Sequence, residues 1–100
     1  MEIKMSMDGG KAVFVVDGKL TVQTAPDLEA AIGKVASDVC EFDIDLTNVD
    51  YVSSAGLRVF VAADQLATSR GGTMRLLHPV SDVMEVFDMT GLADVFTIEA

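Results

Sequence analysis

The segment from residue 41 to 46 constrains the fold of this chain more than any other, because it alternates between acidic and apolar residues. In a β-strand, successive side chains point to opposite faces of the sheet. One face of this strand therefore carries three apolar residues and the other three acids: Phe42, Ile44 and Leu46 against Glu41, Asp43 and Asp45. A strand covered by helices on both faces would not carry three acids on one side. The pattern predicts a sheet with helices mainly on one face and water over most of the other.

The remaining predicted elements follow one another with short connections. A hairpin that turns at Gly9-Gly10 comes first, and later segments change to helical spacing where Thr24 and Ser81 provide caps. The predicted strands span residues 3–7, 11–16, 41–46, 73–77 and 96–98, and the predicted helices run from Thr24 to about Val35, from near Ser54 to about Ser69, and from Ser81 to Gly91. This order predicts an α/β fold in a single domain, residues 1–100, with a mixed sheet of about four to five strands.

Two packing contacts are expected within this fold. Gly56 and Ala63 are small residues on the inner side of the second helix, and they would let this helix lie close to the sheet. Arg75 is expected opposite one of the acids of the 41–46 strand, in an exposed ion pair worth at most about 1 kcal/mol.

Charge and cysteine content narrow the classes of function. The net charge of −9 disfavours nucleic acid and anionic membrane as partners, because both require Lys and Arg. It suits a basic protein partner, and equally a surface that is merely solvated. No run of about 18 apolar residues could insert into a bilayer, and the N-terminus lacks the layout of a secretory signal. Cys40 is the single cysteine, so we expect no internal disulfide and a cytoplasmic location.

The segment most informative about function lies where the 41–46 strand leads into the second helix. It places Ser53 and Ser54 at the start of the helix. Serine is a favoured N-cap, and the positive end of the helix dipole stabilises a phosphate there. Phosphorylation would add about −1.5 to −2 charge and three acceptor oxygens on a protruding corner. Taken alone, the pattern favours an ordinary cap without modification.

Four stretches of the sequence resemble the signature of the STAS domain family, named for sulphate transporters and anti-sigma factor antagonists. They are Val15–Leu20 with Thr24-Ala25, Asp45–Leu57, Gly71–Leu76 and Val83–Leu92. They occur in the family's order and cover nearly the whole chain. The resemblance implies a STAS fold and a bacterial anti-sigma factor antagonist rather than an enzyme.

The resemblance also implies regulation by partner switching. In bacterial antagonists the residue before x-Gly-Leu is phosphorylated by an anti-sigma factor that is also a serine kinase, and this residue matches Ser54. Ser53 stands where many members have Asp, and it is the alternative acceptor. The unphosphorylated protein would bind the kinase and release a sigma factor. Phosphate would end that binding, and a PP2C-type serine phosphatase would restore it.

A partner surface around these serines is expected from the same resemblance. Its residues are Lys19, Thr21, Ser53, Ser54, Leu57, Arg58 and Val61. Lys19 and Thr21 replace the family's usual Glu and Asp, so the identity of the partner stays open. Leu57 and Val61 could instead pack at the edge of the core.

Enzymatic functions find less support in the sequence. The segment around Ser54 lacks the first Gly of a nucleophile elbow, and His78, the single His, precedes Pro79 at a strand end. There is no Gly-rich phosphate loop with Lys, and no grouping of His, Cys and carboxylates. We therefore predict no catalytic residues, no cofactor and no metal. Two alternatives remain: a non-switching STAS scaffold subunit, in a stress-signalling assembly or on a lipid-transport ATPase, and a STAS module that binds a small ligand.

Overall fold

The computed structural model describes all residues, 1–100, as a five-stranded sheet with three helices beside it. The strands are β1 (Glu2–Asp8), β2 (Lys11–Asp17), β3 (Glu41–Asn48), β4 (Met74–Leu77) and β5 (Thr97–Glu99). Their spatial order is the order in the chain. β1 and β2 form the predicted antiparallel hairpin, and Gly9 and Gly10 both have the positive φ that its tight turn requires. β2 to β5 run parallel, which confirms the prediction of a mixed sheet in an α/β fold.

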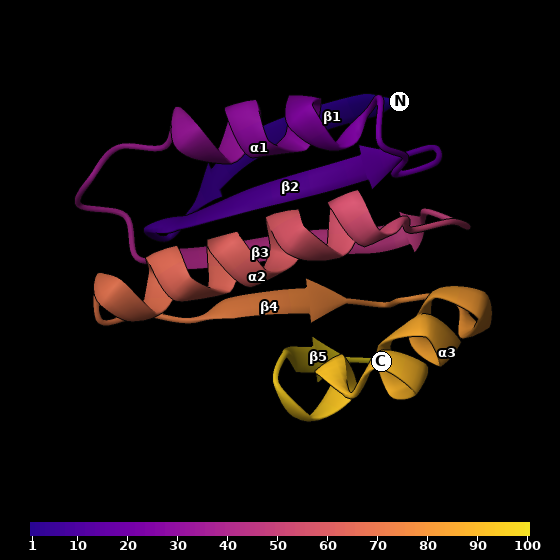
Figure 1. Cartoon of the computed structure of the whole chain (residues 1–100). Helices are drawn as coiled ribbons and strands as arrows, with labels where there is room; N and C mark the ends of the chain where they lie inside the picture. The colour runs from indigo at the N-terminus through magenta and orange to yellow at the C-terminus, as the bar shows by residue number, and fades with distance from the viewer.

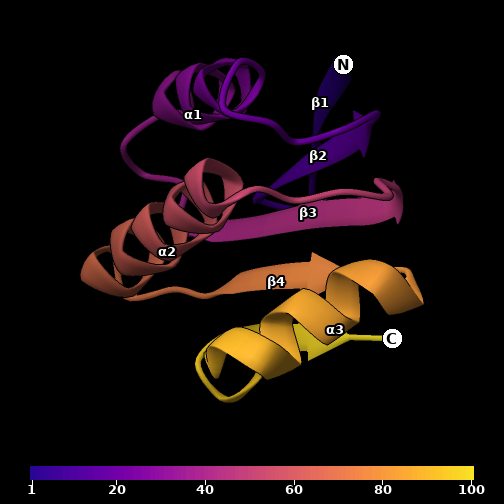
Figure 2. The ribbon, with the colours of Figure 1, turned by 45° about the vertical axis from the view of Figure 1, so that its right-hand side comes forward.

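The helices are α1 (Ala25–Gly33), α2 (Ser54–Ser69) and α3 (Ser81–Thr90), and a short 3-10 turn, η1 (Leu92–Asp94), precedes β5. All three helices lie on one side of the sheet: α1 beside β1 and β2, α2 across β3 and β4, and α3 near β5 (Figure 1, Figure 2). Because β2, β3 and β4 are parallel, the helices that follow them all begin at the same edge of the sheet (Figure 1). None of the helices is long and apolar enough to cross a membrane.

The core lies between the helices and the face of the sheet that they cover. The inward residues of the central strands are fully buried: Ala12, Phe14 and Val16 on β2, Phe42, Ile44 and Leu46 on β3, Met74 and Leu76 on β4. The helices contribute the matching apolar residues, among them Leu28, Phe60 and Phe87. The alternation of residues 41–46 thus placed the core on the correct face of β3.

The opposite face of the sheet was predicted to be mostly open to water, but Asp43 on that face is buried. This acid is only 5% exposed, although no helix covers it. Arg75, its register partner on β4, donates from Nε and Nη2 to the two carboxylate oxygens over 2.8 and 2.5 Å. Glu99 also accepts from Arg75, and Lys11 Nζ lies 3.9 Å from Asp43. The predicted pair exists, but it is wrong to describe it as exposed, because the neighbouring long side chains shield Asp43.

The two predicted helix caps have different outcomes: Thr24 is the N-cap of α1 by position but makes no side-chain cap bond, whereas Ser81 is not the N-cap of α3. The hydroxyl of Thr24 donates to the carbonyl of Lys19 over 2.7 Å and accepts from the N–H of Thr21, so it makes no cap bond to α1. The hydroxyl of Thr21 accepts from the N–H groups of Gln23 and Thr24, in the turn that leads into α1. α3 begins at Ser81, as its predicted range does, but its N-cap is Val80, whose carbonyl accepts the first helical bond from the N–H of Met84. α1 also ends at Gly33 rather than at Val35.

Candidate functional site at the start of α2

The loop before α2 is tied to the loop after β2 by backbone hydrogen bonds. The N–H of Gly18 donates to the carbonyl of Asn48 over 3.1 Å, and that of Leu20 to the carbonyl of Tyr51 over 2.9 Å. The N–H of Ser53 returns a bond to the carbonyl of Leu20 over 2.8 Å. These bonds fix the direction in which α2 leaves the sheet, so its first residues occupy a rigid corner.

Ser53 and Ser54 have different roles at this corner. Ser53 is the N-cap: its backbone is extended, and its hydroxyl accepts from the N–H of Gly56 over 3.3 Å. Its side chain is half-buried. Ser54 is the first residue of α2, is exposed, and makes no side-chain hydrogen bond within the protein. Ser54 therefore offers a free hydroxyl beside the unpaired N–H groups of the first helical turn.

Gly56 allows α2 to approach this corner closely. A Cβ at this position would lie 2.7 Å from Leu20 Cδ2, 2.8 Å from Leu20 Cγ and 3.0 Å from Val52 Cγ1. Leu20 and Val52 are themselves buried and joined by a single parallel bridge. Gly56 was predicted to let this helix lie close to the sheet. In the structure, Gly56 lets α2 lie close to Leu20 and Val52, in the loops beside the sheet.

The other predicted surface residues surround Ser54 in different environments. Lys19 pairs with Asp50 of the loop before α2, with Nζ 3.1 Å from Oδ1, and both side chains are exposed. Thr21 is half-buried and committed to the start of α1. Leu57 and Val61 are half-buried and pack against the core, each leaving part of its surface in solvent. Arg58 is exposed.

Two apolar residues beside Ser54 escaped the sequence analysis. Val22 precedes α1 and is 68% exposed, and Tyr51 precedes α2 and is 48% exposed. Neither belongs to a periodic segment, so only the meeting of the two loops shows that both lie at this corner. Their exposure adds apolar surface to the two loops that meet before α2.

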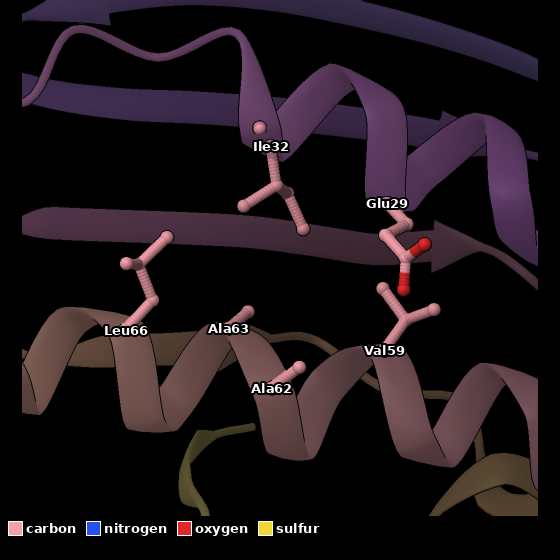
Figure 3. A pocket seen from close by; sticks show the side chains of 7 residues that line it. Glu29, Ile32, Val59, Ala62, Ala63 and Leu66 are labelled. Carbon is pink, nitrogen blue, oxygen red and sulfur yellow. The ribbon is translucent and has the colours of Figure 1, made fainter.

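A groove between α1 and α2 leads away from this corner. Near Ser54 it is a hollow of about 240 Å³ lined by Val22, Ala25, Pro26, Glu29, Ala55, Arg58 and Val59. Further along, a cavity of about 160 Å³ lies between Ile32 of α1 and Ala62, Ala63 and Leu66 of α2 (Figure 3). Glu29 and Val59 line both hollows, which makes them neighbouring parts of one groove. No three His, Cys, Asp or Glu side chains are grouped so as to hold a metal ion.

Comparison with known proteins identifies the family to which this chain belongs. The STAS domain family matches residues 2–100, so the chain belongs to the STAS domain family. The anti-sigma-B factor antagonist of Bacillus subtilis is 32% identical over 85 residues, which are 85% of this chain and 78% of the relative.

Solved structures support the same assignment. An anti-sigma factor antagonist from Mycobacterium paratuberculosis is 27% identical, with a TM-score of 0.86 over 98% of this chain and 84% of its own. The anti-sigma factor antagonist SpoIIAA in its unphosphorylated form is 20% identical, with a TM-score of 0.82. The Bacillus cell fate determinant SpoIIAA in its phosphorylated form is 17% identical, with a TM-score of 0.76. The two SpoIIAA structures cover 99% of this chain and 88% and 91% of their own. At these identities, the SpoIIAA comparison shows the fold alone.

Proposed function

We propose that this chain is an anti-sigma factor antagonist that is switched by phosphorylation of Ser54. In its unphosphorylated form it binds an anti-sigma factor serine kinase in the cytoplasm, so that the kinase releases its sigma factor. The observation that carries this proposal is that the two adjacent serines differ. Ser53 is the N-cap of α2 and its hydroxyl is hydrogen-bonded, whereas the hydroxyl of Ser54 is exposed and makes no hydrogen bond within the protein. The names of the relatives, which are anti-sigma factor antagonists, support the same function.

The modification is a phosphoryl transfer to the Ser54 hydroxyl. The kinase moves the γ-phosphoryl group of ATP to Oγ, the hydroxyl proton is released, and ADP leaves. The new group sits at the N-terminus of a 16-residue helix, where the dipole and the unpaired N–H groups favour negative charge. Because Ser53 already caps the helix, the phosphate changes the surface without breaking a bond that holds α2.

The surface around Ser54 provides the contact with the kinase. In this proposal it comprises Lys19, Thr21, Ser53, Ser54, Leu57, Arg58 and Val61. We add Val22 and Tyr51 because their side chains are exposed. A phosphate at its centre introduces about −1.5 to −2 charge and would have to be desolvated in the complex. That cost amounts to several kcal/mol, and each 1.4 kcal/mol changes affinity about tenfold. A PP2C-type serine phosphatase then hydrolyses the phosphate ester with water and restores the binding surface.

Phosphate mapping tests this proposal. The purified protein is incubated with ATP and a lysate of its source cells, and phosphate is located by mass spectrometry in the wild type, in Ser54→Ala and in Ser53→Ala. We expect phosphate on residue 54 of the wild type and of Ser53→Ala, and none on Ser54→Ala. Ser53→Ala serves as the matched control, because it removes the cap and costs about 1 kcal/mol of stability but leaves the acceptor in place. Phosphate on Ser53 alone, or on neither serine in a lysate that labels a control substrate, would contradict the proposal.

A further inference from the structure

The three arginines of this chain differ in what their guanidinium groups contact. Arg75 donates to Asp43 and to Glu99. Arg70 donates to the carbonyls of Ala36 and Val39 over 3.2 and 2.8 Å and lies over the ring of Phe42. Arg58 makes no hydrogen bond or ion pair, and it is exposed in a chain of net charge −9. Its donors are therefore available to an anion.

The helix places Arg58 within reach of Ser54. The two residues are four positions apart in α2, so they lie on the same face about one turn apart. Side chains of an α-helix lean toward its N-terminus, which directs Arg58 back toward Ser54. An anion followed by a cation four residues later is also the favourable orientation of such a pair. Both side chains are exposed, so a group added to Ser54 can meet the guanidinium without moving the backbone.

Across the groove from Arg58, helix α1 presents Glu29, which forms no ion pair with the guanidinium. Arg58 lines the hollow of the α1–α2 groove nearest Ser54, together with Glu29 of α1. Glu29 attracts the guanidinium electrostatically, but no nitrogen of Arg58 lies within 4.0 Å of its carboxylate. A phosphate has a higher charge and more acceptor oxygens than a carboxylate, and its geometry matches the fork of a guanidinium.

We propose that Arg58 is the intramolecular partner of the phosphate on Ser54, forming a charge-assisted pair with it along the first turns of α2. This inference rests on the proposed phosphorylation of Ser54. The pair holds the phosphate against the helix at the mouth of the groove and favours its doubly charged form at neutral pH. The pair thus restricts the rotation of the phosphate, so that its negative charge has a defined position on the surface that binds the kinase.

The experiment introduces phosphoserine at residue 54 during translation, so that no kinase is needed. Phosphorus NMR follows the phosphate from pH 4 to pH 8 in the wild type, in Arg58→Gln, in Arg58→Lys and in Lys34→Gln. Lys34→Gln is the matched control, because it removes one positive charge from the exposed far end of α1. Thermal unfolding of the unmodified variants, which we expect to match the wild type, verifies that each variant is folded.

We expect the titration midpoint of Arg58→Gln to lie about 0.15–0.4 pH unit above that of the wild type, as for an exposed i, i+4 pair of opposite charges. Arg58→Lys should fall between them, and Lys34→Gln should coincide with the wild type. The difference should shrink in 1 M salt, where the Debye length falls to about 3 Å. Equal midpoints for the wild type and Arg58→Gln, or an equal shift in Lys34→Gln, would overturn the inference. Failure of kinase labelling would count against the proposed function and leave this result intact.

Discussion

At the scale of single residues, Ser53 and Ser54 are adjacent but differ in whether their hydroxyl groups are hydrogen-bonded within the protein. The Ser53 oxygen accepts from the N–H of Gly56, whereas the Ser54 oxygen points into solvent one residue further on. A modification at Ser53 would have to break the cap of α2, and a modification at Ser54 would not. This difference is the physical basis for proposing Ser54, rather than Ser53, as the acceptor.

Gly56 is the residue at which the corner is most sensitive to substitution. We expect Gly56→Ala to lower the free energy of unfolding by about 1–3 kcal/mol, because its Cβ would press on buried Leu20 and Val52. Gly33→Ala is the matched control: nothing lies within 4 Å of its Cβ, and we expect it to raise stability by up to about 1 kcal/mol. Urea denaturation measures both. An equal effect of the two substitutions would contradict the close contact at Gly56.

The lowered pKa of Asp45 leads us to expect that the stability of the protein depends on pH. Burial alone would raise the pKa of its carboxyl, but the hydroxyl and N–H of Thr47, over 2.6 and 2.9 Å, and nearby His78 bring this pKa below its ordinary value of 3.8. A lowered pKa in the folded state stabilises the protein above the unfolded pKa. That stability is lost as the pH falls through the folded pKa.

We expect Thr47→Val to raise the Asp45 pKa and to lower stability at neutral pH, with the difference vanishing in acid. Carbon NMR of the carboxyl and urea denaturation at several pH values measure these effects. Thr97→Val is the control, because Thr97 is also exposed on a strand and makes no side-chain hydrogen bond. An unchanged Asp45 pKa in Thr47→Val would show that the Thr47 hydroxyl does not stabilise the carboxylate.

At the scale of the elements, ion pairs between neighbouring strands stabilise the face of the sheet that no helix covers. Asp43 and Glu99 both accept from Arg75, but Asp43 is buried and Glu99 is exposed. We expect Asp43→Ala to cost about 1–3 kcal/mol and Glu99→Ala less than about 1 kcal/mol. Thermal or urea unfolding distinguishes them. Equal losses would mean that the burial of Asp43 has no energetic effect.

The sequence predicted the elements well, because their periodicity is local. Apolar alternation and helical spacing located every strand and helix within a few residues, and the Ser-Ser pair lies at the start of α2 as predicted. The failures came from contacts between distant segments. The burial of Asp43 depends on the register of β3 with β4, and the roles of Thr21 and Thr24 depend on a loop that folds back to Lys19. The exposure of Val22 beside Ser54 and the unpaired state of Arg58 are likewise properties of the folded chain.

At the scale of the whole molecule, three aromatic rings join the C-terminal third to the rest of the domain. Phe60 of α2, Phe87 of α3 and Phe96 before β5 are buried and meet edge to face, with ring centroids 5.7–6.2 Å apart. We expect Phe87→Ala to cost about 3–5 kcal/mol. Met89→Ala, on the same helix but 77% exposed, should change stability by less than about 0.5 kcal/mol. Similar unfolding midpoints for the two variants would contradict the role of this cluster.

The layered arrangement is compatible with the proposed switch, because the Ser54 corner can be modified without refolding the domain. The sheet and the core fix where α1, α2 and α3 begin, and the bonds between the loops hold the Ser54 corner to that frame. The proposed phosphate there would change charge and shape on the surface and leave the core unaltered. The effect of the switch should therefore appear in binding rather than in the fold.

The affinity of the two forms of the protein for their partner tests the central claim most directly. The anti-sigma factor kinase identified by labelling is titrated calorimetrically with unmodified protein and with protein that carries phosphoserine at residue 54. We predict that phosphorylation weakens binding by at least about 100-fold while the circular dichroism spectrum stays the same. Equal affinity of the two forms would contradict the account of Ser54 as the switch.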